Sequence, residues 1–549
     1  MLRLYSLGYI DSMFLNLRPW TRASVARMLE DAGPRIDDDQ GTEAGDQAQE
    51  IYDALLHELR DDIQGPCLTQ KGQARIESAY TVIRGISGNP LRDSYHMGST
   101  IINDYGRPYQ AGFNNFTGAS GYATAGRFSF YARAEFQRAP SGTGYSEAVA
   151  EALTTYPDEI TPFINPVTNQ PYNFATVPMG PISSATQVRV MEAVVSAHVL
   201  NHEISFGKHD NWLSPAQGGA FAWSNNAENI YAFQINRTEP LHVPLLSRLT
   251  GPFRYDFQVG ALQGHTLVPN PKYPGPDEPN VITPGNPWVH IEKVSFRPTP
   301  DLEFGFARTV IWGGKGHAPI TIHTFLKSFF SFSSPSAADK EGRNDPGARY
   351  GQFDASWRLP VFHKLFTLYT DSEVHDDIVA PSAPRRGAWR PGLYLSHVPG
   401  VPRLDLRVEG VYTDPPTRTS NRGEFMYFEQ IQRQGYTNKG QIFGDWIGRE
   451  DKGGQAWATW HLSGNEWLQF NYRRQKAAKD FIAASPTQEY GTTLDDFGFQ
   501  AVKRVGHDFE VNANFTVEHY KAPMYLPGPQ TVTTTNVQLT WYPTRKTSF

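Results

Sequence analysis

Hydrophobic and polar residues alternate strictly along several stretches of this chain, and no other feature constrains its fold as much. In RFSFYARAEFQ (127–137), three phenylalanines and two alanines fall on one side, whereas Arg133 and Glu135 fall on the other. Side chains of a β-strand point to opposite faces with a period of two residues. The stretch therefore predicts a strand with one aromatic face and one charged face, and its surroundings must suit both.

The period of two residues continues from residue 76 towards the end of the chain. In FRYDFQVGA (253–261), Arg254 and Asp256 fall on the face opposite three aromatic residues. Similar stretches are RLDLRVEGVY (403–412), FEVNANFTVEHY (509–520) and VTTTNVQLTWY (532–542). Glycine and proline number 48 and 41, which is typical of a chain with many turns. We therefore expect an all-β domain over residues 73–549.

The connections between these strands alternate in length. The segments 297–301, 463–466 and 505–508 are short, whereas 313–348 and 475–493 are long. Short turns on one side and long loops on the other are typical of a large antiparallel transmembrane β-barrel of the outer-membrane type. About 18 strands fit the length of the chain, and 16 fit nearly as well. The order of the turns places the carboxyl end on the short-turn, periplasmic side, and the segment 432–454 does not fit the alternation.

In a barrel, the aromatic face of 127–137 would meet lipid and the charged face would line a wet lumen. The chain has no run of 18 or more apolar residues, so no transmembrane helix is expected. The mean hydropathy of −0.48 does not argue against a barrel, because half of each strand faces a polar lumen. The alternative is a soluble β-sandwich or propeller whose aromatic face packs in a dry core. No repeat of about 40–50 residues, typical of a propeller, is evident.

The first 72 residues follow a helical period instead and predict a small helical domain at the periplasmic mouth. Thr21 is the expected N-cap of a helix that Gly33 and Pro34 end, and a second helix is expected over 46–62 after an acidic linker. The chain opens on residues typical of the end of a helix, without the basic and apolar regions of a signal peptide. We expect either a mature chain or a start that lies upstream of Met1.

The composition and the motifs argue against several classes of function. The net charge of −6 and the pI of about 6.3 give no reason to expect nucleic acid as a partner. A single cysteine, Cys67, allows neither an internal disulfide nor a cysteine zinc site. His198 and His202 would lie about 13 Å apart on an extended strand, too far to share a metal ion. No nucleophile elbow is present, and adjacent acids such as 376–377 are expected in solvated loops. We therefore expect no catalytic residue, no metal and no cofactor.

Several longer segments resemble the Wzi family of capsule assembly proteins, in the form common among acidobacterial genomes. They are LGYIDSMFLNLRPWTR (7–22), GISGNPLRDSYHMGSTIINDYGRPYQAGFNNFTG (85–118), ISFGKHDNWLSPAQGGAFAWSNNAENIY (204–231), VSFRPTPDLEFGFART (294–309), LDLRVEGVYTD (404–414) and GDWIGREDKGGQAW (444–457). The resemblance implies an outer-membrane β-barrel with an N-terminal helical bundle at its periplasmic mouth. It also implies a non-enzymatic, lectin-like role, in which capsular or related polysaccharide is held at the cell surface. One segment departs from the family pattern, because NWLSPAQGG (211–219) has Ser214 and Ala216 where the family has glycine.

The polar lumen face and the segment around Trp212 supply the candidate ligand-binding residues. We expect sugar units to contact a set of arginines, carboxylates, amides and one tryptophan, namely Arg133, Glu135, Trp212, Asn225, Asn226, Glu228, Arg254 and Asp256. Such groups offer planar, bidentate hydrogen bonds. Other loop tryptophans (Trp223, Trp389, Trp446) could stack on sugar rings, or pack within loops and at the membrane interface instead. The expected partners are surface polysaccharide and outer-membrane lipid, and the expected state is a monomer in the outer membrane.

Two alternatives remain open from the sequence. A porin of the same architecture would use the charged lumen as a path for saccharides or other solutes. A soluble, glycan-active all-β enzyme would leave the membrane fraction and would turn over a polysaccharide through two carboxylates.

Overall fold

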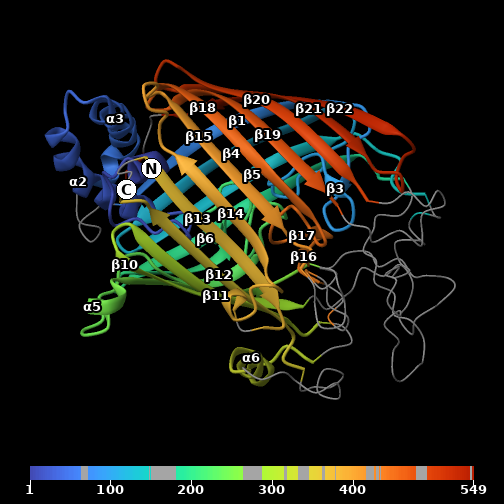
Figure 1. The fold of residues 1–549 in the computed structure, drawn as a ribbon, viewed down its shortest axis with the longest axis horizontal. Coiled ribbons are helices and arrows are strands. Elements are labelled where there is room, and N and C mark those ends of the chain that lie inside the picture. Colours follow the sequence, from blue (N-terminus) through green and yellow to red (C-terminus); the bar gives the residue numbers. More distant parts are fainter. Residues whose placement is uncertain are drawn as a thin grey trace.

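The computed structural model describes residues 1–63, 72–146, 149, 181–263, 287–314, 318–331, 345–360, 365–377, 379–415, 426–427, 432, 435–477, 491–543 and 547–548. Within them, 18 antiparallel strands form one closed barrel. Three helices, α1 (Leu2–Ser6), α2 (Arg22–Asp38) and α3 (Glu43–Ile63), belong to the amino-terminal part. Figure 1 shows α2 and α3 at one end of the barrel, beside both termini.

Each barrel strand pairs with the next barrel strand along the chain, and β1 also pairs with β22, which closes the sheet on itself. The count confirms 18 strands over 16. The barrel strands are β1 (Gln73–Ser87), β4 (Gly112–Ala125), β5 (Phe128–Ala139), β6 (Ala185–Val199), β7 (His202–Lys208), β8 (Tyr231–Arg237), β9 (Phe253–Ala261), β10 (Trp288–Thr299), β11 (Leu302–Trp312), β12 (Ala348–Arg358), β13 (Phe366–His375), β14 (Ala388–Leu395), β15 (Leu404–Tyr412), β18 (Lys452–Ser463), β19 (Glu466–Lys476), β20 (Thr493–Val505), β21 (Phe509–Lys521) and β22 (Pro529–Trp541).

The remaining elements are short and lie in the connections. Two small hairpins stand apart from the barrel sheet, formed by β2 (Arg92–Asp93) with β3 (Gly98–Ser99) and by β16 (Thr437–Asn438) with β17 (Gln441–Ile442). The carboxyl-terminal β23 (Thr547–Ser548) pairs only with the first two residues of β1. The other helices are α5 (Ser247–Thr250), α6 (Ile322–Phe329) and the 3-10 turn η1 (Ala380–Ser382).

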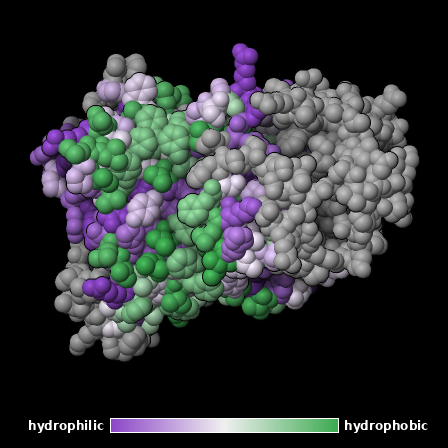
Figure 2. All heavy atoms as spheres, turned by 90° about the horizontal axis from the view of Figure 1, so that it is seen from below, coloured by the Kyte–Doolittle hydropathy of each residue, from purple (hydrophilic) through white to green (hydrophobic). Residues whose placement is uncertain are grey.

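The alternation of the sequence corresponds to the two faces of the barrel wall, as predicted. In β5, Phe128 is 65% exposed on the outside, whereas Glu135 is 1% exposed inside the lumen. Large apolar residues point outward and are exposed on strands all around the barrel, including Ile83, Phe113, Val195, Phe206, Val294, Val408, Phe470, Phe499, Phe515 and Leu539. Figure 2 shows hydrophobic side chains over much of the described part of one face. In the part of the chain that the structure describes, no helix is long and apolar enough to cross a membrane.

The amino-terminal helices differ in their bounds from the expectation. Thr21 caps α2 as predicted, because its side chain accepts a hydrogen bond from the backbone N–H of Ser24. The prediction that Gly33 and Pro34 end this helix is wrong, since α2 continues through them to Asp38. A Cβ on Gly33 would lie 2.8 Å from the Tyr52 hydroxyl of α3. Close packing of α2 against α3 therefore stabilises a helix that its local sequence would interrupt.

Candidate functional site

Three connections between barrel strands fold inward and fill much of the lumen. They comprise residues 88–111, 209–230 and 435–451, which we call the plug. The first is joined to the second by the Tyr105 N–H, which donates to the Asn225 carbonyl at 2.6 Å. The second is joined to the third by the Ser224 N–H, which donates to the Phe443 carbonyl at 3.2 Å. The stretch 432–454, which the strand pattern could not place, lies mostly in this plug.

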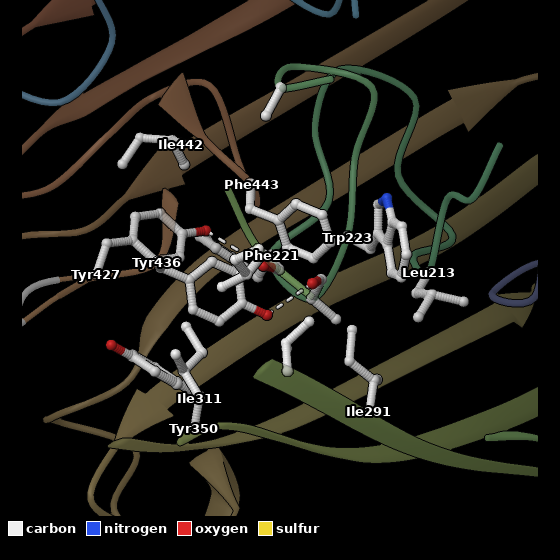
Figure 3. Close-up of a cluster of buried hydrophobic side chains, with 14 of the residues drawn as sticks. Leu213, Phe221, Trp223, Ile291, Ile311, Tyr350, Tyr427, Tyr436, Ile442 and Phe443 are labelled. Carbon is white, nitrogen blue, oxygen red and sulfur yellow. Dashed lines mark hydrogen bonds between the residues drawn. The ribbon is translucent and has the colours of Figure 1, made fainter. Parts of the chain in front are cut away.

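The centre of the plug is apolar and packs against the inner face of the barrel wall. Figure 3 shows Trp223 and Phe443 of the plug with Ile291 of β10 and Ile311 of β11 in one cluster. The rings of Trp223 and Phe443 lie 4.4 Å apart. Tyr436 joins them through its hydroxyl, which donates to the Ala222 carbonyl at 2.6 Å. This part of the lumen is thus a packed core.

A buried ion pair fixes the plug to the wall. Arg390 of β14 donates from Nε and Nη2 to the two carboxylate oxygens of Asp445, at 2.6 and 2.7 Å. A third contact runs from Arg390 Nη1 to Glu409 of β15 at 3.1 Å. All three side chains are fully buried. A bidentate arginine–carboxylate pair defines both distance and orientation, so it fixes the position of residues around 445.

The amino-terminal segment enters the lumen from the other mouth. The backbone N–H of Leu15 donates to the Glu303 carboxylate of β11 at 2.9 Å, and Asn16 accepts from Ser295 of β10 at 2.9 Å. Arg18 and Trp212 exchange backbone hydrogen bonds of 3.2 and 2.9 Å. The segment from one mouth therefore meets the plug from the other.

Between them lies a cavity of about 750 Å³. Amide side chains from five consecutive barrel strands form one wall, namely Gln455, Gln469, Asn471, Gln500, Asn514 and Asn536. Trp212, Trp457, Arg84 and Arg473 complete it, together with polar groups of the plug. Asn514 Oδ1 and Asp496 Oδ1 are buried and have no hydrogen-bond partner. Buried polar atoms require a partner, so these two oxygens are free to bind water or a ligand hydroxyl.

A second cavity of about 510 Å³ adjoins the first at Arg18, Asp210 and Asn211 and reaches the rim at Gln73 and Arg22. Aromatic and charged side chains line it, including Tyr122, Tyr131, His198, Glu203, His209 and Asp256. Burial lowers the pKa of His209 to about 4, so its imidazole is neutral at pH 7.

Three of the predicted ligand-binding residues line these cavities. Trp212 and Asn225 border the larger cavity, and Asp256 borders the smaller one. Trp212 also donates from Nε1 to the Ala216 carbonyl at 2.8 Å, which orients its ring. In contrast, Trp223 and Trp446 are almost fully buried within the plug.

The other five predicted residues make contacts within the protein, and neither cavity includes them. Glu135 accepts from Arg107 and Tyr80, and Arg133 pairs with Glu192 at 2.9 Å. Asn226 donates to the Ile442 carbonyl at 3.0 Å, and Arg254 donates to the Arg237 carbonyl at 2.7 Å.

Glu228 is the centre of a cluster of cations. It contacts Lys208, Arg189 at 3.2 Å and Lys439 at 2.7 Å. Burial alone would raise the pKa of Glu228, but these three cations hold it below its usual range. The cluster joins β6 and β7 to two parts of the plug.

The amide wall was not predicted, although the sequence contains a signal for it. Inward positions of the last strands carry amides at every second residue, as in Gln469 with Asn471 and Asn512 with Asn514. The inward face of each strand taken alone resembles an ordinary polar face. Only the closed sheet brings these amides together.

Among the described residues, no group of three or more histidines, cysteines or carboxylates could hold a metal ion.

The fold and the lumen define a large, closed outer-membrane-type barrel whose interior is plugged from both mouths. The chain belongs to the family of the capsule assembly protein Wzi, whose model matches residues 82–535. It is similar in fold to a solved Escherichia coli structure, described as Wzi, an outer-membrane protein involved in group 1 capsule assembly and a carbohydrate-binding β-barrel. That match has a TM-score of 0.62 at 14% identity and covers 98% of this chain and 96% of that chain.

Two further similarities are weaker or cover only part of the chain. An uncharacterized 55.8 kDa protein in the cps region of Klebsiella pneumoniae is 24% identical over 180 residues. The match covers 32% of this chain and only 31% of that relative. OpdQ of Pseudomonas aeruginosa has a TM-score of 0.41 at 7% identity, over 87% of this chain and 99% of that one.

The departure at NWLSPAQGG does not disturb the turn. Ser214 and Ala216 do not have positive φ angles, so glycine is not required at either position. Ala216 is buried against Tyr369 and Tyr394. The retained glycines differ, because a Cβ on Gly219 would collide with the carboxylate of Asp445.

Proposed function

We propose that the protein is a non-enzymatic outer-membrane lectin that binds surface polysaccharide and anchors it to the cell. Membership of the Wzi family over most of the chain carries this proposal. The E. coli relative of the same fold is described as carbohydrate-binding. The exposed apolar side chains around the barrel wall support a place in the membrane in contact with lipid, because monomeric soluble proteins rarely expose such a band. The state that we propose there is a monomer.

We place a sugar-binding site of this protein in the larger lumen cavity. Its wall offers uncharged amide donors and acceptors in a row, and three tryptophans, Trp20, Trp212 and Trp457, border it. Sugar hydroxyls both donate and accept hydrogen bonds, and amides match them in both roles. The unpartnered oxygen of Asn514 would accept from such a hydroxyl. Among the predicted residues, Trp212 and Asn225 remain candidates for this role, whereas Asp256 borders the adjoining smaller cavity.

The direct test measures binding of the purified barrel to polysaccharide isolated from the producing organism. Each of Gln500→Leu and Asn514→Leu should weaken binding about fivefold, because one hydrogen bond contributes about 1 kcal/mol. Asn465→Leu is the matched control, since this exposed amide lies in a turn outside the cavity. Unchanged binding in both lumen variants would mean that the sugar-binding site lies outside the larger cavity. Loss of binding in all three would point to misfolding.

The porin alternative predicts ion flow through the lumen. The packed plug and the inserted amino-terminal segment oppose it, so single-channel recordings in planar bilayers should show no steady conductance. Ohmic channels in the unmodified protein would contradict the lectin proposal and favour the porin. The soluble-enzyme alternative would be favoured by recovery in the soluble fraction together with shortening of the polysaccharide.

A further inference from the structure

Helix α6 lies on the outside of the barrel, towards the end away from the amino-terminal helices (Figure 1). It follows β11 and begins at a capping box. Thr321 Oγ1 accepts from the Thr324 N–H at 3.2 Å, and Thr324 Oγ1 accepts from the Thr321 N–H at 3.0 Å. These two hydrogen bonds satisfy backbone groups at the start of the helix and so define where it begins.

One face of α6 packs on the outer wall. The ring of Phe325 lies 5.7 Å from Trp312 of β11, and the ring of Phe329 lies 6.0 Å from Phe257 of β9. Trp312 and its neighbour Val310 point outward, yet both are buried. Phe325 packs on the Trp312 ring, so α6 contributes to the cover of this part of the wall.

The same face of α6 also covers charged groups on the wall. Glu292 of β10 and Arg308 of β11 point outward and form an ion pair of 3.1 Å. Arg308 donates to the carbonyl of Phe329 at the end of the helix, and His290 contacts the Ser328 hydroxyl at 3.0 Å. Charged groups are costly on a lipid-facing wall, and the helix shields these from that environment.

The side of α6 next to this packed face is apolar and exposed. Ile322, Leu326 and Phe330, spaced four residues apart on one helical face, are 80%, 45% and 62% exposed. This face continues the exposed apolar band of the barrel wall, because Trp288 stands at the start of β10 and Phe306 points outward from β11. The wall seen from the side on which α6 lies is shown in Figure 2.

Two polar residues border this apolar face. His323 and Lys327, also four residues apart, follow Ile322 and Leu326 on the adjacent side of the helix. An apolar face with a basic edge is the pattern of helices that lie in a membrane interface. Tryptophans near such a helix, here Trp288, are typical of the same depth.

We propose that α6 is an interfacial helix that inserts Ile322, Leu326 and Phe330 among the acyl chains of the membrane leaflet at this end of the barrel. His323 and Lys327 then lie at the level of the head groups. The helix seals the charged pair on the wall from lipid and adds a lipid-binding surface outside the barrel. This inference rests on the proposed membrane location, and its occupant is lipid rather than a second copy of the chain.

The test places an environment-sensitive fluorophore on single cysteines in a Cys67→Ser background, in vesicles whose acyl chains carry bromine. Labels at Ile322→Cys and Leu326→Cys should emit at shorter wavelength and lose most of their fluorescence to the bromine. Phe499→Cys on the exposed barrel wall is the positive control. Asp38→Cys on exposed α2 is the aqueous control and should keep its fluorescence.

Quenching at 499 without quenching at 322 and 326 would overturn the proposal for α6 alone. No quenching at 499 would instead overturn the membrane location. Energy transfer between labels at 322 on two copies, at high dilution in lipid, would show that a second copy covers the face and would also overturn it. As a matched pair, Leu326→Glu should abolish quenching at 322, whereas His323→Gln, which keeps a polar side chain at the level of the head groups, should preserve it. Both variants should still fold, which is checked by the faster migration of a closed barrel on a gel when the sample is not boiled.

Discussion

At the scale of single residues, the plug depends on glycines that allow close approach. Gly219 lies against the carboxylate of Asp445, which itself binds Arg390. Gly219→Ala should displace this carboxylate and destabilise the folded state by about 1–3 kcal/mol, the usual cost of overpacking. The measurement is the midpoint of denaturant unfolding in detergent. Gly410→Ala is the control, because a Cβ there would meet nothing within 4 Å, and an equal loss in both variants would contradict the argument.

The sequence predicts which face a residue occupies, but not which residue it meets. Alternation placed Glu135, Arg254 and Asp256 inside the barrel, where the structure has them. It could not show that Arg107 would neutralise Glu135, since Arg107 lies in the plug and reaches it only after the barrel closes. For the same reason, the sequence does not predict that position 219 requires glycine, because the carboxylate of Asp445 approaches it only in the folded barrel.

At the scale of elements, Arg390 of β14 is the buried ionic contact that joins the wall to the plug, and we expect it to keep the lumen closed. Arg390→Met would leave the carboxylates of Asp445 and Glu409 buried without their cation. Removing one partner of a buried pair costs about 3–5 kcal/mol, so the plug should detach locally. We expect intermittent conductance in planar bilayers, where the unmodified protein should show no steady conductance.

The control for this prediction is Arg474→Met. Arg474 pairs with Asp495 on the exposed outside of the barrel, where an ion pair contributes about 0–1 kcal/mol. It should leave the lumen closed. If the Arg390→Met variant shows no conductance, the apolar centre around Trp223 and Phe443 retains the plug without this ion pair.

The strands were predicted from the sequence, whereas the end of α2 and the plug segment were not. Long strands with period two were recognised because each strand displays its environment in its own residues. The end of α2 was missed because packing against Tyr52 overrides the signal of Gly33 and Pro34. The plug segment 435–451 was left without an assignment, since a connection buried inside a barrel follows neither helical nor strand periodicity.

At the scale of the whole molecule, the barrel architecture was predictable because turn length alternates with every strand. The strand number was fixed only by closure, in which Ile83 of β1 pairs with Val537 of β22. Sequence length alone allowed 16 strands as well as 18. The cavity between the plug and the amino-terminal segment was not predictable, since distant parts of the chain form its walls.

Closure at this seam leads to a final prediction about the intact barrel. A chain that lacks residues 529–549 would lose β22 and leave β1 and β21 with unpaired edges, which favour aggregation. Refolded in detergent, it should not give the faster-migrating band that a closed barrel shows on a gel without boiling. A chain that lacks only residues 547–549 should still show that band, because β23 pairs with only two residues of β1. Retention of the band after loss of β22 would mean that the sheet closes by another register, and loss of the band in both chains would make β23 part of the seam.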